Sequence, residues 1–138
     1  MKTVIVNAHV ISPGVDLPGA AVEIVDGKIT KVAKVAKVGK NDWVFDAKGA
    51  YVVPGFIDVH LHGACGYVVC DASPEAIEKI AEAKLSEGCT SFLPTTLTVG
   101  NDNLTAAAKA VAEYRKTTKF SKVAGIHLEG PFINVKCC

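Results

Sequence analysis

The sequence predicts an α/β fold in which a β-rich segment, residues 1–53, precedes alternating strands and helices in residues 54–138. Apolar runs centred on Ile57, Phe92 and Ile126 lie 35 and 34 residues apart, with a helical pattern between each pair. Strands that alternate with helices in this way form parallel β/α units. Such units build barrels of about 250 residues. Since only three units are present, we expect the first three β/α units of a partial (β/α)8 TIM barrel.

Residues 1–53 contain two patterns typical of β structure. Ala21–Val25 and Lys28–Val32 flank an Asp-Gly pair, which predicts a hairpin because a tight primed turn needs positive φ. The lysine-rich run Lys31–Val38 is typical of a charged edge strand that leads into a solvated turn. Trp43–Asp46 is a further short strand.

The first unit of the second part begins with the apolar strand Phe56–His62. A helix follows, because Ser73 offers a hydroxyl cap and Pro74 suits the first helical position. The helix is expected to end at Gly88.

The next strand is Thr90–Leu93, and Pro94 interrupts it. A second helix is expected to start near Asn101, and Val123–Glu129 to form the third strand.

The clearest chemical pattern is Asp58-x-His60-x-His62. Residues two apart in a strand point to the same face, so these side chains should project together from the end of the first parallel strand. Two neighbouring imidazoles suit a divalent transition metal such as zinc, whereas the alternative is a pair of surface histidines. We assign His60 and His62 as metal ligands. Asp58 is expected to orient a ligand or to contact substrate.

His127-x-Glu129 repeats this spacing on the third strand, and parallel strands would aim both side chains at the same mouth. We assign Glu129 as a metal ligand; the alternative is a carboxylate held by backbone donors or an ion pair, since an unpaired buried one is costly. His127 is expected to orient a ligand or contact substrate, or else to be a satisfied core histidine. Thr95 and Thr96 favour a turn with self-satisfied hydroxyls over substrate contacts.

Composition excludes several other classes. Fifteen Lys plus Arg against fourteen Asp plus Glu leave a net charge of +1, which gives no drive toward nucleic acid or membrane surfaces. The chain has neither a signal-peptide pattern nor a membrane-spanning run. The odd number of cysteines, without a Cys-x-x-Cys pair, favours a reducing cytoplasm and argues against a disulfide framework; they are Cys65, Cys70, Cys89, Cys137 and Cys138.

Two longer motifs carry a resemblance. Pro54–Gly63 resembles the first-strand signature of the amidohydrolase superfamily, which dihydroorotases and deaminases share. Gly125–Asn134, together with Gly88–Thr95, is similar to the N-acetylglucosamine-6-phosphate deacetylase family. The resemblance runs from the N-terminal β segment to about Asn134, and Val135–Cys138 departs from it.

The resemblance implies a small β-sandwich, to which residues 1–53 would contribute, beside a metal-dependent hydrolase barrel that starts in residues 54–138. It implies cleavage of N-acetylglucosamine 6-phosphate, a small amino-sugar phosphate, to glucosamine 6-phosphate and acetate. In that family the residue matching Glu129 is a metal ligand, and the pair matching His60 and His62 supports a further metal. Zinc is the expected ion, with iron, manganese and cobalt as alternatives, and the full-length enzyme is expected to be a homo-oligomer.

Family members carry further metal-binding histidines, a proton-shuttling aspartate and phosphate-binding residues on later strands. We therefore expect the catalytic aspartate beyond residue 138, no catalytic residue within the chain, and no acetate release by this N-terminal portion alone. Two alternatives stay open. One is another amidohydrolase acting on a cyclic amide or imine. The other is a non-catalytic metal-binding fragment whose open strand edges pair with another chain.

Overall fold

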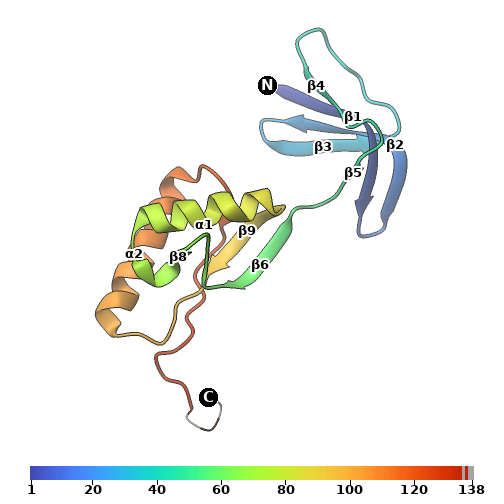
Figure 1. The fold of residues 1–138 in the computed structure, drawn as a ribbon. Helices are drawn as coiled ribbons and strands as arrows, with labels where there is room; N and C mark the ends of the chain where they lie inside the picture. The colour runs from blue at the N-terminus through green and yellow to red at the C-terminus, as the bar shows by residue number, and fades with distance from the viewer. Residues whose placement is uncertain (135, 137–138) are drawn as a thin grey trace. The chain divides into compact units, whose positions relative to one another are not determined.

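The computed structural model describes residues 1–134 and 136, so most of the predicted departure at Val135–Cys138 lies outside the described residues. The chain divides into two compact units, Met1–Pro54 and Gly55–Cys138 (Figure 1). This division falls one residue after the predicted boundary. Each unit has a hydrophobic core of its own.

The strands of unit 1 are β1 (Lys2–Ser12), β2 (Val15–Val25), β3 (Lys28–Ala33), β4 (Trp43–Asp46) and β5 (Tyr51–Val52). They form one sheet in the order β3-β2-β1-β4, and β5 also pairs with β1. The predicted hairpin is confirmed: β2 and β3 are antiparallel, and Asp26 and Gly27 between them have φ of 48° and 76°. β3 is an edge strand, as predicted, and ends at Ala33.

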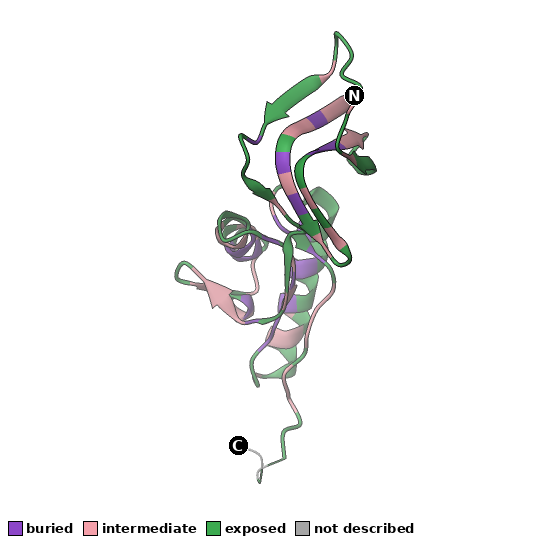
Figure 2. Cartoon of the chain, turned by 90° about the vertical axis from the view of Figure 1, so that its right-hand side faces the viewer, coloured by how far each residue is buried: buried purple, intermediate pink, exposed green. Residues whose placement is uncertain are grey.

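The core cluster of unit 1 comprises Ala8 and Val10 of β1, Ala20 and Val22 of β2, and Ala47. Buried and more accessible residues alternate along β1 (Figure 2), with Val4, Ala8 and Val10 buried. The alternation is interrupted at Asn7, where the register with β2 shifts and φ is 54°. Asparagine tolerates this conformation better than most residues, so the bulge adds little strain.

The elements of unit 2 are β6 (Phe56–Leu61), β7 (Gly63–Ala64), β8 (Tyr67–Val68), the short 3-10 helix η1 (Val69–Asp71), α1 (Pro74–Ser86), β9 (Cys89–Pro94), α2 (Asn101–Thr117) and β10 (Lys122–Val123). β6, β9 and β10 form a parallel sheet with β9 in the centre, which confirms the predicted parallel β/α alternation. Of the described helices, none has the length and apolar character to span a membrane.

Both helices pack against the central strand of this sheet (Figure 1). Phe92 of β9 is fully buried, as are Ile77 and Ile80 of α1, and Val111 of α2 belongs to the same buried cluster. The hydroxyl of Tyr114 donates to the carbonyl oxygen of Ser121, so this buried polar atom is satisfied. The mixed α/β architecture follows from this layer of helices on parallel strands.

The start of α1 is as predicted, and it provides a test of helix capping. The Ser73 hydroxyl accepts a hydrogen bond of 3.1 Å from the backbone N–H of Ala76. Ser73→Ala is expected to lower the free energy of unfolding by about 1 kcal/mol, because that donor loses its partner. Urea denaturation followed by circular dichroism measures the change. Ser73→Asp should retain the wild-type midpoint, and an unchanged midpoint for Ser73→Ala would contradict the capping role.

The third strand differs from the prediction. Val123–Glu129 was expected to be continuous, but β10 is confined to Lys122–Val123 and a single bridge pairs Thr95 with His127. Pro94 has no N–H to donate, so it removes a ladder hydrogen bond from the central strand at this level. The chain beyond β10 is held instead by separate bonds, such as that from the N–H of His127 to the carbonyl oxygen of Pro94.

Candidate metal centre

The two histidines of the first motif converge at the end of β6. His60 is in β6 and His62 follows its last residue. Their Nε2 atoms lie 3.2 Å apart, and the ring centroids 5.0 Å apart. Parallel strands place such residues at the carboxyl edge of the sheet, where α/β enzymes carry their sites. The structure therefore brings His60 and His62 together, as their spacing predicts.

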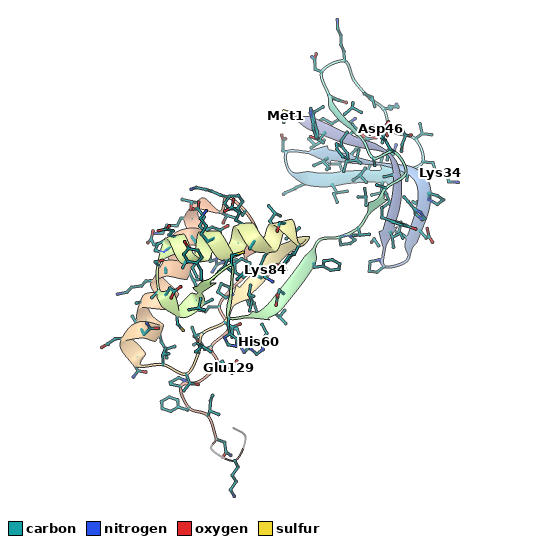
Figure 3. All side chains as sticks on the ribbon, viewed as in Figure 1. Met1, Lys34, Asp46, His60, Lys84 and Glu129 are labelled. Atoms are coloured by element: carbon teal, nitrogen blue, oxygen red, sulfur yellow. The ribbon has the colours of Figure 1, made fainter. Side chains whose placement is uncertain are left out.

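Glu129 reaches this pair from a segment 69 residues further along the chain (Figure 3). Its Oε2 lies 2.8 Å from Nε2 of His60 and 3.2 Å from Nε2 of His62. Glu129 therefore lies beside the two histidines, as expected, although it does not lie in the expected continuous strand. Gly130, with φ of 86°, turns the chain directly after Glu129.

The donor chemistry of His60, His62 and Glu129 fits a divalent metal ion. These three residues are called the metal-directed group below. Imidazole nitrogens that present a lone pair and a carboxylate oxygen are ligands that divalent transition metals accept in proteins. Ligands at about 2.0–2.2 Å from a tetrahedral ion lie roughly 3.3–3.6 Å from one another. The three observed separations, 2.8 to 3.2 Å, are a few tenths of an ångström shorter. A small outward movement of the side chains would therefore accommodate the ion.

His127 lies beside this group without being one of its three members. Its ring centroid is 4.8 Å from that of His60, at an interplanar angle of 86°. Its Nδ1 lies 3.3 Å from Oγ1 of Thr95, which is fully buried. Thr95 was not among the predicted site residues, because a Pro-Thr-Thr stretch is more often a turn. Its position directly after a parallel strand was the feature of the sequence that could have pointed to it.

Asp58 makes a contact other than the one predicted. Its Oδ1 accepts a hydrogen bond of 3.1 Å from the backbone N–H of His60. The register of β6 against β9 shifts between Asp58 and Leu61, so the strict alternation of side chains is interrupted there. A role for the Asp58 carboxylate in orienting a ligand remains a prediction.

A hollow of about 420 Å³ runs along β6 and has His60 at one end. Lys84 of α1 and Glu87 also line it. The hydrogen bond from Lys84 Nζ to the Glu87 carboxylate raises the pKa of the Lys84 ammonium. Of the three metal-directed residues only His60 borders this hollow, so the hollow follows the strand edge and does not enclose the metal-directed group.

The second ring nitrogen of His62, Nδ1, is buried. It has no hydrogen-bond partner among the described residues. Metal-bound histidines normally donate this second N–H to a carboxylate, a carbonyl or water.

Cys65 and Cys70 are free thiols, and neither belongs to the metal-directed group.

Gly130 provides a test of how Glu129 is positioned. A Cβ at this residue would lie 2.5 Å from Oγ1 of Thr98, and a positive φ is unfavourable for alanine. Gly130→Ala is expected to destabilise the chain by roughly 1–3 kcal/mol and to weaken zinc binding, because Glu129 must shift. Denaturation and zinc titration measure both effects. Gly100→Ala is the control, since nothing lies within 4 Å there; equal behaviour of the two variants would contradict the prediction.

Comparison with known proteins identifies the family. Residues 51–137 match the model of the amidohydrolase family. The chain is 33% identical over 138 residues to N-acetylglucosamine-6-phosphate deacetylase of Haemophilus influenzae, a match that covers 99% of this chain and 36% of that enzyme. It is 39% identical over 80 residues to N-acetylgalactosamine-6-phosphate deacetylase of Escherichia coli O157:H7, covering 57% of this chain and 21% of that one.

A solved structure gives a similar result. The crystal structure of N-acetylglucosamine-6-phosphate deacetylase from Pasteurella multocida superposes with a TM-score of 0.87 at 31% sequence identity. The match covers 99% of this chain and 36% of that one. The chain thus spans about a third of the length of these deacetylases. By its match to the family model over residues 51–137, the chain belongs to the amidohydrolase family.

Proposed function

We propose that this chain contributes the first part of a metal-dependent deacetylase that hydrolyses N-acetylglucosamine 6-phosphate to glucosamine 6-phosphate and acetate. The observation that carries the proposal is the convergence of His60, His62 and Glu129 within 3.2 Å of one another at the carboxyl edge of parallel strands. The names of the relatives direct the choice of substrate.

Zinc is the ion that this proposal assigns to the centre, with iron, manganese and cobalt as competitors. Two imidazole nitrogens and one carboxylate oxygen are a donor set that zinc accepts in hydrolases. When bound, such an ion polarises a carbonyl group and lowers the pKa of a water molecule. His60 and His62 would hold it as neutral donors, and Glu129 would supply the negative charge that offsets part of its own.

The proposal extends to the fold. In it, unit 2 forms the first three β/α units of a (β/α)8 barrel, and unit 1 is a segment of a β-sandwich. β6 is an edge of the described sheet, yet Phe56, Ile57 and Val59 are 66%, 66% and 61% exposed. Apolar side chains of this size on an open edge strand are typical of a strand that has further neighbours. A homo-oligomeric, cytoplasmic enzyme is part of the same proposal.

A second substrate is favoured by a specific observation, the match to an N-acetylgalactosamine-6-phosphate deacetylase. The two sugar phosphates differ only in the configuration of one hydroxyl group. The metal-directed residues would act on the acetamide group, which both sugars share. The described part of the chain therefore supports the reaction class more directly than the choice between the two epimers.

The experiment that tests the proposal is a chimera. Residues 1–134 of this chain are joined to the remaining segment of the Haemophilus influenzae deacetylase, and acetate release is measured. The substrate panel contains both N-acetylhexosamine 6-phosphates and a cyclic amide. We expect release from an acetylated sugar phosphate that depends on added zinc and that Glu129→Ala abolishes.

Glu113→Ala is the matched control, because Glu113 is an exposed glutamate of α2 in an ion pair with Lys116. It should retain the activity of the unsubstituted chimera. Hydrolysis of the cyclic amide alone would favour the alternative amidohydrolase. A folded, zinc-loaded chimera without any activity would leave the non-catalytic metal-binding module as the better account.

A further inference from the structure

We infer that Thr95 is a positioning residue that holds His127 as the tautomer protonated at Nδ1, so that Nε2 of His127 is a hydrogen-bond acceptor beside the metal-directed group. The inference deepens the proposed function and rests on it for the role of the metal-directed group. It concerns a buried hydroxyl that joins three segments of unit 2.

Three partners surround Oγ1 of Thr95. It accepts a hydrogen bond of 2.9 Å from the backbone N–H of Leu61, and it lies 3.2 Å from the carbonyl oxygen of Leu93. The third partner is Nδ1 of His127, at 3.3 Å. Thr95 is fully buried, so its hydroxyl must be satisfied by these groups.

The balance of donors and acceptors selects one tautomer. A hydroxyl group has one proton to donate and two lone pairs that accept. The carbonyl oxygen of Leu93 can only accept, so it takes the hydroxyl proton. The N–H of Leu61 uses one lone pair, and the remaining lone pair can be used only if Nδ1 of His127 carries a proton. With the other tautomer, either the Leu93 oxygen or Nδ1 would face a lone pair of Oγ1.

The backbone around His127 maintains this contact. The N–H of His127 donates to the carbonyl oxygen of Pro94 at 3.0 Å, and the carbonyl oxygen of His127 accepts from the N–H of Thr96 at 3.0 Å. Both bonds connect His127 to the residues that flank Thr95. The ring therefore starts from a backbone already held next to the hydroxyl.

The second ring nitrogen of His127, Nε2, is then an acceptor. A neutral imidazole protonated at Nδ1 has a lone pair at Nε2. The ring lies edge to face against that of His60, so this acceptor belongs to the surroundings of the metal-directed group.

The same hydroxyl also supports the metal-directed histidines. The hydroxyl accepts a hydrogen bond from the backbone N–H of Leu61, which lies between His60 and His62 in the chain. The carbonyl oxygen of Leu61 in turn accepts from the backbone N–H of Thr95 at 2.8 Å. Loss of the hydroxyl would leave a buried N–H without its partner. Thr95 thus links the position of both imidazoles to that of His127.

The test is a nitrogen-15 NMR measurement of the full chain labelled at histidine. Long-range proton–nitrogen correlations distinguish a protonated ring nitrogen from one with a lone pair. Spectra are recorded with chelator present at a pH above about 8, where an ordinary imidazole is neutral. The chain has four histidines, and Gln substitutions at each in turn assign the signals. We expect a protonated Nδ1 for His127, and a protonated Nε2 would overturn the inference.

Two variants separate positioning from general support of the fold. Thr95→Ser keeps the hydroxyl and should keep the His127 tautomer. Thr95→Val keeps the shape, removes the hydroxyl, and should shift His127 toward the Nε2-protonated form. Retention of the Nδ1-protonated form in Thr95→Val would overturn the inference. Should Thr95→Val fail to fold, the wild-type and Thr95→Ser spectra decide by the same criterion.

Zinc titration then tests the link to the metal-directed group. We expect Thr95→Val to weaken zinc binding by about 10-fold, the lower end of what losing a direct partner of a ligand costs, because Thr95 reaches the histidines only through the backbone of Leu61. Thr95→Ser should match wild type. Equal affinity in all three would overturn the support of His60 and His62 by Thr95. If zinc left the wild-type signals of His60 and His62 unchanged, the proposed function would fail while the tautomer result stood.

Discussion

Glu129→Ala is expected to weaken zinc binding by more than about 100-fold. Removing a group that is only hydrogen-bonded to a metal ligand usually weakens binding by about 10- to 100-fold. Glu129 is the only anionic member of the metal-directed group, and its Oε2 lies within 3.2 Å of both imidazole Nε2 atoms. Its removal takes away a ligand atom and the charge that balances the ion. Competition with a chromogenic chelator measures the affinity of the purified chain.

Two variants make this result specific. Glu129→Gln retains the shape but loses the charge, and it should bind zinc more weakly than wild type. Glu113→Ala removes an exposed glutamate from α2 and should bind as wild type does. Wild-type affinity for Glu129→Ala would show that the carboxylate is not a ligand and would remove the basis of the proposed centre.

Phe92→Ala is expected to destabilise unit 2 by about 3–5 kcal/mol, the usual cost of emptying a buried aromatic site. Phe92 is fully buried in the central strand β9, between the other strands of the parallel sheet and both helices. A unit of this size has only about 4–12 kcal/mol of stability. Denaturant unfolding followed by tertiary-structure probes should therefore show a large fall in its midpoint.

The matched control is Phe132→Ala, because Phe132 belongs to the same unit and is 96% exposed. Its midpoint should stay near that of wild type. Zinc should partly restore the midpoint of Phe92→Ala, since a ligand that binds only the folded state stabilises it. Similar midpoints for the two phenylalanine variants would mean that the core of unit 2 lies elsewhere.

Local features of the chain could be predicted because they depend on neighbours in the sequence. The Asp-Gly pair requires positive φ and forms the turn between β2 and β3. Ser73 caps α1 because its hydroxyl reaches an N–H three residues ahead. The spacing of His60 and His62 brings their Nε2 atoms together at the end of a strand.

The third strand could not be predicted from local composition. Val123–Glu129 has the composition of a strand, but β10 ends at Val123. Pairing depends on the neighbouring strand, and Pro94 in β9 lacks the N–H that a continuing ladder needs. The effect of a proline on a partner about 30 residues away follows from the pairing register and not from the periodicity of either segment.

The β/α alternation, the hairpin, the helix cap and the candidate ligands His60, His62 and Glu129 could all be predicted from local patterns in the chain. Two features could be seen only in the folded chain: Glu129 reaches the histidines without a continuous strand, and Thr95 connects Leu61 with His127. The difference lies in how far apart in the chain the interacting residues are. Turns, caps and side-chain alternation are set by residues a few positions apart. The partners of a buried hydroxyl or a carboxylate are set by which segments pack together.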